Sequence, residues 1–366
     1  GLIGQSSLDM PQKSFKVVAK AALGTRYFDA PLFADRPFEQ YKSFVLRVSG
    51  NDAVWTRMVD GVQSRLIDQL PDKHVINQAW QPVIVYLNGQ YWGHYNLRER
   101  VSRYFVAQHE GIPLEDADNM TIIEGGSPRY YGSNAEWVAF RKKMNESNPA
   151  TNPEDLQYIL DNVDVDSLFD WMALEMFFAN TDSGNIRYYR VPGGKWRWIV
   201  FDMDYGLFIA ANNGVRNILN PKGHGANDDV DNSLFLKILE NDQMRDKFLR
   251  RFGEIFQFYT TERMLAQVDE SYNLLQPEMK LHWERWAPFN LKNIAFDLPQ
   301  TADGAMRYWE SRVERLRNVV RKRPRHCWVQ AQEWFRLTDQ QMLEYFGPKP
   351  AFPPEADLNK DDRAIE

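Results

Sequence analysis

Two groups of polar residues flank a predicted β-hairpin in the middle of the chain. These residues are Asn180, Asp182, Asn185, Asp202 and Asp204. Segments 186–191 and 196–201 are rich in aromatic and β-branched residues, and the Pro-Gly-Gly sequence at 192–194 is typical of a turn. A hairpin returns the chain to its starting end, so the two polar groups can converge there. Carboxylate and amide oxygens suit a hard cation such as Mg²⁺, which usually keeps waters and substrate phosphates as further ligands.

The order of these residues is typical of protein-kinase-like phosphotransferases. In those enzymes a catalytic-loop aspartate, a nearby metal-binding asparagine, a hairpin and a second metal-binding aspartate follow one another. The usual HRD and DFG sequences are absent, and so is a glycine loop of either common phosphate-binding pattern. Taken singly, each residue is also explained by turn formation or by a solvated strand end. The ordered set favours a site for metal-dependent phosphoryl transfer.

The segment before the first polar group is a predicted buried helix over 168–178, because it is apolar nearly all round. Near the N-terminus, the alternation of residues 13–20 predicts a strand. Lys16 and Lys20 share one face of it, and either could reach a phosphate as the strand lysine of a kinase-like lobe does. A lysine-rich solvent face is the alternative interpretation.

Further elements are predicted between residues 43 and 110. They are a strand over 43–48, a turn over 49–52, a helix over 54–70, a hairpin of 83–87 and 91–97, and a helix over 101–110. The hairpin turns at Asn88-Gly89, the strongest short hairpin signal. Arg57 and Asp60 are three residues apart on the predicted helix, so they could share a face and orient a lysine or phosphate, or form a surface ion pair. The transition from strand to helix at Glu99 resembles a hinge between two lobes.

The remainder of the chain is predicted to be a loop-rich insertion followed by helices. Residues 111–153 are interpreted as an insertion or lobe-crossing segment, and 210–232, which contains His224, as a loop where a kinase carries its activation segment. The predicted helices cover 234–240, 243–259, 261–275, 304–323 and 339–345. The basic run 321–325 is interpreted as a helix C-terminus, which favours cations.

Composition narrows the class of protein. A chain of 366 residues with 43% hydrophobic and 26% charged residues fits one two-lobed domain or two domains with a large core. The net charge of -6 argues against general nucleic-acid binding. Cys327 is the single cysteine, which excludes an intrachain disulfide framework and a Cys-based zinc site. The sequence shows no membrane-spanning run or signal peptide, and residues upstream of Gly1 are expected to be missing.

Several motifs occur in a specific order. They are Gly4-Gln5-Ser6-Ser7, Lys13-Ser14-Phe15-Lys16, the Leu46-Arg47-Val48-Ser49-Gly50-Asn51-Asp52 turn, Val85-Tyr86-Leu87-Asn88-Gly89-Gln90-Tyr91-Trp92-Gly93 running into Leu97-Arg98-Glu99, Asn180-Thr181-Asp182 and Asp202-Met203-Asp204. With these motifs the chain resembles the CotH kinase family, typified by spore-coat protein H, from about residue 4 to about residue 323.

The resemblance implies an α+β, atypical protein-kinase-like fold with two lobes. The small β-rich N-lobe is expected over residues 1–100, the larger helical C-lobe over 101–346, and a linker or disordered tail over 347–366. It also implies binding of ATP with Mg²⁺ or Mn²⁺ and phosphorylation of Ser or Thr in a protein substrate. An exported, cell-surface or extracellular bacterial protein is expected.

The resemblance also assigns roles to single residues. Asp182 matches the catalytic aspartate, and Asn185, Asp202 and Asp204 are the expected metal ligands. Lys16, with Lys20 in reserve, is the expected phosphate-contacting lysine, and Arg47 and Glu99 are expected to contact the nucleotide. One feature departs from the kinase pattern, since Asn185 follows Asp182 by three residues instead of five.

Two other functions stay open at this point. A pseudokinase or adhesion module within a larger exported protein would keep the fold and bind a protein or glycan through its aromatic-rich surface. The shifted Asn185 and the missing glycine loop favour it modestly. A metal-dependent hydrolase built on Asp202 and Asp204 is less well supported, because no histidine or further carboxylate is placed to complete a two-metal site.

Overall fold

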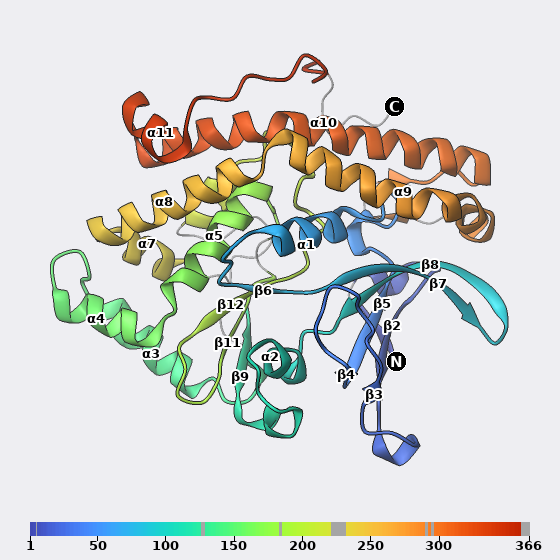
Figure 1. Ribbon diagram of the computed structural model, residues 1–366, viewed down its shortest axis with the longest axis horizontal. Coiled ribbons are helices and arrows are strands. Elements are labelled where there is room, and N and C mark those ends of the chain that lie inside the picture. The colour runs from blue at the N-terminus through green and yellow to red at the C-terminus, as the bar shows by residue number, and fades with distance from the viewer. Residues whose placement is uncertain are drawn as a thin grey trace.

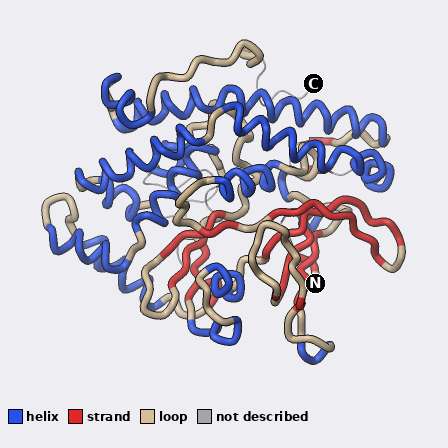
Figure 2. Tube along the Cα trace, viewed as in Figure 1, coloured by secondary structure: helices blue, strands red, loops and turns tan. Residues whose placement is uncertain are grey.

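A computed structural model of the chain describes residues 1–4, 6–125, 129–182, 185–220, 232–289, 292–293 and 296–359. It combines helices with mainly antiparallel sheets, which is compatible with the expected α+β class (Figures 1 and 2). Two five-stranded sheets lie on one side, and long helices cover the other side. The division into a small and a large kinase-like lobe stays a prediction.

The first sheet has the strand order β1-β2-β5-β8-β7 and is antiparallel throughout. Its strands are β1 (Leu2–Ile3), β2 (Ser14–Val18), β5 (Ser43–Arg47), β7 (Trp80–Leu87) and β8 (Gln90–Glu99). The predicted hairpin at Asn88-Gly89 is confirmed, and both turn residues have the positive φ (50° and 77°) that a tight hairpin requires.

The two faces of the first sheet differ in character. The register pairs Val45 with Arg98 and Arg47 with Asn96, so these side chains share one face. The opposite face carries apolar residues, among them Leu46 and Leu97, which pack into small hydrophobic clusters. One face of β5 and β8 is therefore available for charged side chains.

The second sheet has the order β10-β9-β11-β12-β6, in which only the pairing of β6 with β12 is parallel. Its strands are β6 (Ile76–Asn77), β9 (Thr121–Glu124), β10 (Arg129–Tyr131), β11 (Arg187–Arg190) and β12 (Arg197–Val200). Two short pairs, β3 (Phe28–Asp29) with β4 (Gln40–Tyr41) and β13 (Lys292–Asn293) with β14 (Phe296–Asp297), complete the described strands. Since β9 pairs with β11, part of the 111–153 segment, which was interpreted as an insertion or lobe-crossing segment, belongs to this sheet.

The helices enclose the main hydrophobic core. The described helices are α1 (Val59–Gln69), α2 (Arg103–His109), α3 (Ala135–Glu146), α4 (Pro153–Asn162), α5 (Val165–Phe178), α6 (Gly214–Leu219), α7 (Ser233–Leu239), α8 (Asp242–Phe258), α9 (Thr261–Trp286), α10 (Ala302–Phe335) and α11 (Asp339–Phe346). The predicted buried helix corresponds to α5, which is buried along nearly its whole length. In Figure 1, α8 to α11 form an outer layer over α1 and α5. None of the described helices is long and apolar enough to cross a membrane.

Three predicted helix boundaries were wrong. Helix α1 begins at Val59 and not at residue 54, because Ser49, Gly50 and Arg57 have positive φ and hold the preceding segment in turns. Helices α9 and α10 continue through Pro277 and Pro324. Proline removes one helical hydrogen bond, but the residues beyond each proline are buried in the main core, which keeps both helices intact.

Arg323 shows why the length of α10 matters. It is fully buried and donates hydrogen bonds to the carbonyl oxygens of Met176 (2.9 Å) and Phe177 (2.6 Å), in the last turn of α5. It also donates to the carbonyls of Ala210 and Asn212. The last carbonyls of a helix lack partners within the helix and favour a cation. The basic run was predicted to be a helix C-terminus, and this was wrong. It lies inside α10, where its Arg323 caps the end of α5.

The tail after residue 347 is described as far as residue 359 and contains no helix or strand over that range. Asp357 is tied to α10 through its backbone, which exchanges two hydrogen bonds with the side chain of Asn318. The predicted activation-segment loop lies partly in α6, and its residues 221–231, with His224, lie outside the described residues.

Replacing Arg323 by methionine should lower the free energy of unfolding by roughly 3 kcal/mol or more, because several buried carbonyl groups lose their donor at once. Arg321→Met is the matched control, since Arg321 pairs at 2.7 Å with the half-exposed Glu314, and it should cost about 1 kcal/mol or less. Urea unfolding followed by tryptophan fluorescence measures both values. Equal losses in the two variants would contradict the capping role of Arg323.

Candidate functional site

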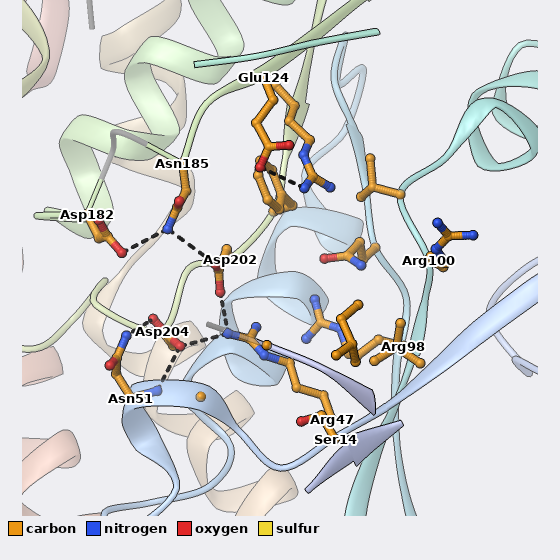
Figure 3. A pocket seen from close by; sticks show the side chains of 18 of the residues that line it. Ser14, Arg47, Asn51, Arg98, Arg100, Glu124, Asp182, Asn185, Asp202 and Asp204 are labelled. Atoms are coloured by element: carbon orange, nitrogen blue, oxygen red, sulfur yellow. Dashed lines mark hydrogen bonds and ion pairs between the residues drawn. The ribbon is translucent and has the colours of Figure 1, made fainter. Parts of the chain in front are cut away.

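A cavity of about 340 Å³ lies between the two sheets. The first sheet contributes Ser14, Val45, Arg47 and Arg98, the second contributes Glu124, Tyr130 and Arg187, and the segments after α5 and β12 contribute Asp182, Asn185, Asp202 and Asp204. Figure 3 shows Asp182, Asp202 and Asp204 on one side and Arg98 and Arg100 on the other. This volume lies in the range of small-molecule sites, roughly 300–1,000 Å³.

The end of α5 sets the direction of the first polar segment. Ala179 adopts the left-handed conformation (φ 52°, ψ 46°) that often ends a helix. The side-chain oxygen of Asn180 then accepts a hydrogen bond from the backbone N–H of Asp182 (3.2 Å). Asp182 is thus held by a capped helix end and a short turn.

Asn185 connects the two polar groups that flank the hairpin. Its Nδ2 donates to Oδ2 of Asp182 (2.8 Å) and to Oδ2 of Asp202 (3.3 Å). The polar groups before and after the hairpin therefore meet, as expected (Figure 3).

Asp202 and Asp204 follow β12 closely. Asp202 has φ 58°, a left-handed conformation that is uncommon outside glycine but tolerated by aspartate. Such conformations gather at functional sites. Asp204 is buried, and its Oδ2 accepts a hydrogen bond from the backbone N–H of Asn51 (3.0 Å). Burial, and then the charge of Asp202, raise the pKa of Asp204 well above its usual value, although Arg47 acts against this.

Arg47 lies at the centre of the acidic residues. Its Nη2 pairs with Asp202 and with Asp204 (2.7 Å), and its Nη1 pairs with Asp60 (2.6 Å). Asp60, on α1, also accepts from Arg98 (3.0 Å) and from the backbone N–H of Met203 (3.2 Å). Although burial acts to raise it, Arg98 and Arg47 hold the pKa of Asp60 below its usual value.

The other side of the cavity is basic and aromatic. Arg98 is buried, and Arg100 lies two residues beyond it in the chain, at the cavity wall. Arg187 pairs with Glu124 (3.0 Å), and its guanidinium lies 4.2 Å from the ring centroids of both Tyr130 and Phe201. The arginines on this wall face the aspartates across the cavity, which suits a ligand that carries phosphates together with a metal ion.

The two predicted phosphate-contacting lysines, Lys16 and Lys20, do not line the cavity. Lys16 pairs with Val45 in the sheet register, so it shares a face with Ser14 and Val45, which line the cavity, but it is not itself in the described lining. Lys20 lies beyond the end of β2, is exposed, and is also outside that lining.

Glu99 is turned away from the cavity. Strand alternation puts it on the opposite face of β8 from Arg98. There it is buried and bonded to Arg36 (3.1 Å), His109 (3.1 Å) and the backbone N–H of Ala79 (2.8 Å). Its expected contact with the nucleotide is therefore not supported by its position, and its neighbour Arg98 takes the place at the cavity.

Sequence reasoning gave no role to several residues of the site. They are Asn51, Arg98, Arg100, Glu124 and Arg187. Arg98 could have been found by pairing the hairpin strand with the 43–48 strand, because that register puts it beside Val45 and close to Arg47.

Arg57 and Asp60 do not share a helix face. Arg57 precedes α1, and its guanidinium donates to the Ala53 carbonyl (2.8 Å) and to Gln12 (3.0 Å).

The donor set fits a hard cation in part. In the described ranges no three His, Cys, Asp or Glu side chains are grouped to hold one metal ion. Asp202 and the amide oxygen of Asn185 can supply two oxygen ligands, with Asp182 or Asp204 next to them. Mg²⁺ is usually held by one or two carboxylates and completes its shell with waters and substrate phosphates. The residues present therefore fit a metal that is bound together with a nucleotide.

Two carboxyl groups near the site have raised pKa values. Burial, and then Asp202, raise the pKa of Asp182 to about 6, although the hydrogen bond from Asn185 acts against this. Glu175, on α5, is buried, and its Oε2 has no hydrogen-bond partner among the described residues. Burial raises the pKa of Glu175 to about 8, while Asn180 lowers it and Asp182 and Asp202 raise it further. Glu175 is therefore neutral at pH 7 in the folded protein.

Glu175 should make stability depend on pH. Its folded-state pKa, about 8, exceeds its ordinary value of 4.5, so its contribution to stability is complete below pH 4.5 and is lost as the pH rises towards 8. In Glu175→Gln this loss is absent. The free energy of unfolding of the variant relative to the wild type should therefore increase by roughly 1 kcal/mol per pH unit across this window. Urea unfolding at several pH values measures the difference, and a difference that does not change with pH would refute this assignment.

Comparison with protein families identifies one match. The family described as CotH kinase protein matches residues 2–327 of the 366-residue chain. This range includes every residue of the cavity described above. A comparison with curated proteins gave no match. Because the matched residues make up most of the chain, the chain belongs to the CotH kinase family.

Proposed function

We propose that this protein is an ATP- and divalent-metal-dependent phosphotransferase that phosphorylates Ser or Thr residues of proteins. The observation that carries the proposal is the hydrogen-bonded series from Asp182 through Asn185 to Asp202 at the acidic side of the cavity, opposite an arginine-rich wall. Family membership supports kinase-like chemistry.

The proposal includes a two-lobed arrangement. The first sheet would serve as the small lobe and the helical part as the large lobe, with the nucleotide in the cavity between the sheets. Arg47 and Asp60 join a strand to helix α1 by an ion pair of 2.6 Å. In protein kinases a strand lysine and a helix glutamate form the corresponding pair. An exported or cell-surface location is also part of the proposal.

The roles of the residues follow from the needs of phosphoryl transfer, which depends on alignment and charge neutralisation. Asp202 would hold the metal, with Asn185 or Asp204 as a further oxygen donor. A bound divalent cation would neutralise charge on the transferring phosphate. Arg98 and Arg100 would donate to phosphate oxygens from the opposite wall.

Asp182 is the best-placed proton acceptor. It is partly buried, close to the metal-binding residues, and its pKa of about 6 lies near neutral pH. A general base is most effective when its pKa is close to the working pH. Asp182 would orient the hydroxyl group of the substrate and accept its proton as the phosphate is transferred.

A pseudokinase is the second candidate. Asn185 directs its Nδ2, and not its oxygen, towards Asp182 and Asp202, and Arg47 contacts Asp202 and Asp204. If this arrangement persisted with nucleotide bound, the protein would bind ATP without transferring phosphate.

Replacement of two aspartates should separate binding from transfer. Asp182→Asn should bind ATP with Mg²⁺ within a few-fold of the wild type but slow transfer by roughly 100- to 10,000-fold, because only the proton acceptor is lost. Asp202→Ala should lose metal-dependent ATP binding. Calorimetry measures binding, and labelled ATP with the protein itself and dephosphorylated casein as acceptors measures transfer.

Asp303→Asn is the control, because Asp303 is exposed at the start of α10, far along the chain from the cavity residues. It should match the wild type in both assays. Metal-dependent ATP binding by the wild type without any transfer would favour the pseudokinase. Absence of binding with ATP and either Mg²⁺ or Mn²⁺ would contradict the proposed function.

A further inference from the structure

The Asp202 carboxylate has a hydrogen-bond donor on each oxygen. Nη2 of Arg47 pairs with Oδ1, and Nδ2 of Asn185 donates to Oδ2 at 3.3 Å. A carboxylate has about four lone-pair sites, so a metal ion can bind beside these two donors. The metal would then share the Asp202 carboxylate with the positive charge of Arg47, and repulsion between the two cations opposes its binding.

The three carboxylate contacts of Arg47 differ in their exposure to solvent. The side chain of Asp202 is 29% exposed, that of Asp60 is 9% exposed and that of Asp204 is 2% exposed. Ion pairs at the solvent boundary exchange at low cost, whereas breaking a buried pair leaves an uncompensated buried charge. The contact with Asp202 is thus the one that can be released while the other two remain.

The backbone around Gly50 fixes the position of the contact between Arg47 and Asp204. A Cβ atom at Gly50 would lie 2.6 Å from Nη2 of Arg47 and would overlap the carboxylate of Asp204. Asn51 also holds Asp204 through its backbone N–H. Arg47 and Asp204 are therefore packed tightly against this turn, which leaves the side of the guanidinium towards Asp202 as the exchangeable one.

We propose that Arg47 is an internal counter-cation of Asp202 that is exchanged for the metal ion. Without metal, Arg47 neutralises Asp202 and keeps metal affinity low. When metal and nucleotide enter together, the N–H group released from Asp202 can donate to a phosphate oxygen, while Asp60 and Asp204 keep the guanidinium in place. The nucleotide part of this inference rests on the proposed function, whereas the competition between Arg47 and metal does not.

Titration with Mn²⁺ alone, without nucleotide, tests the competition by calorimetry. Arg47→Met should bind Mn²⁺ at least tenfold more tightly than the wild type, because no cation then occupies Oδ1 of Asp202. Arg47→Lys keeps one charge but loses the planar guanidinium fork that spans the three carboxylates, so it should show a smaller gain. If Arg47→Met fails to fold, as judged by circular dichroism, Arg47→Lys decides the question.

Two controls locate the effect. Arg100→Met removes a cation from the same cavity, and the described structure gives Arg100 no contact with Asp202, so Mn²⁺ affinity should change less than twofold. Adding Asp202→Asn to Arg47→Met should abolish the gain. The inference is overturned if folded Arg47 variants bind Mn²⁺ no more tightly than the wild type, if Arg100→Met gives the same gain, or if the gain survives Asp202→Asn. A protein that shows the Mn²⁺ competition but never binds ATP would contradict only the proposed function.

Discussion

The site depends on the ion cluster around Arg47. Asp60, Asp202 and Asp204 come from two parts of the chain that lie far apart in sequence, and each contacts the same guanidinium. Carboxylates this close repel one another, and burial strengthens the repulsion because the surroundings screen charge poorly. The positive charges of Arg47 and the neighbouring Arg98 offset this repulsion, which allows the three carboxylates to lie close together. The cluster also joins the first sheet, helix α1 and the segment after β12, so the same interaction that holds the cavity together supplies its acidic wall.

A second constraint fixes the other half of the site. Helix α5 ends at Phe178, shortly before Asp182, and Arg323 of α10 donates to the last carbonyls of that helix. A frayed end of α5 would move Asn180 and Asp182 together, since the two are linked by a hydrogen bond. The long helical layer seen in Figure 1 thus does more than cover the core, because it sets where the first polar segment begins.

The sequence predicted which site residues meet where they belong to one continuous stretch of chain. The order of Asp182, Asn185 and Asp202 around a hairpin predicted that these side chains meet, and they do. Residues brought together by strand register were harder to identify. Glu99 was chosen for the cavity although alternation along β8 presents Arg98 there instead, and only the pairing of β8 with β5 distinguishes the two. Lys16 shares a face of the sheet with Ser14 and Val45, which line the cavity, but is not itself among the lining residues.

The features that could not be predicted depend on contacts between segments far apart in the sequence. Proline normally ends a helix, so nothing local to Pro324 shows that α10 continues and that Arg323 is buried against α5. Likewise, the segment after residue 111 resembles a loop by composition, and only its pairing with β11 makes β9 part of a sheet.

The most direct test is a crystal structure with Mn²⁺ and a non-hydrolysable ATP analogue, in which anomalous scattering locates the metal. A peak in coordination contact with the Asp202 carboxylate, with the phosphates of the analogue between it and the arginine wall, is the predicted result. A peak that avoids Asp202, or an analogue bound outside the cavity between the two sheets, would contradict the claim that the carboxylates gathered by Arg47 form a site for metal and nucleotide.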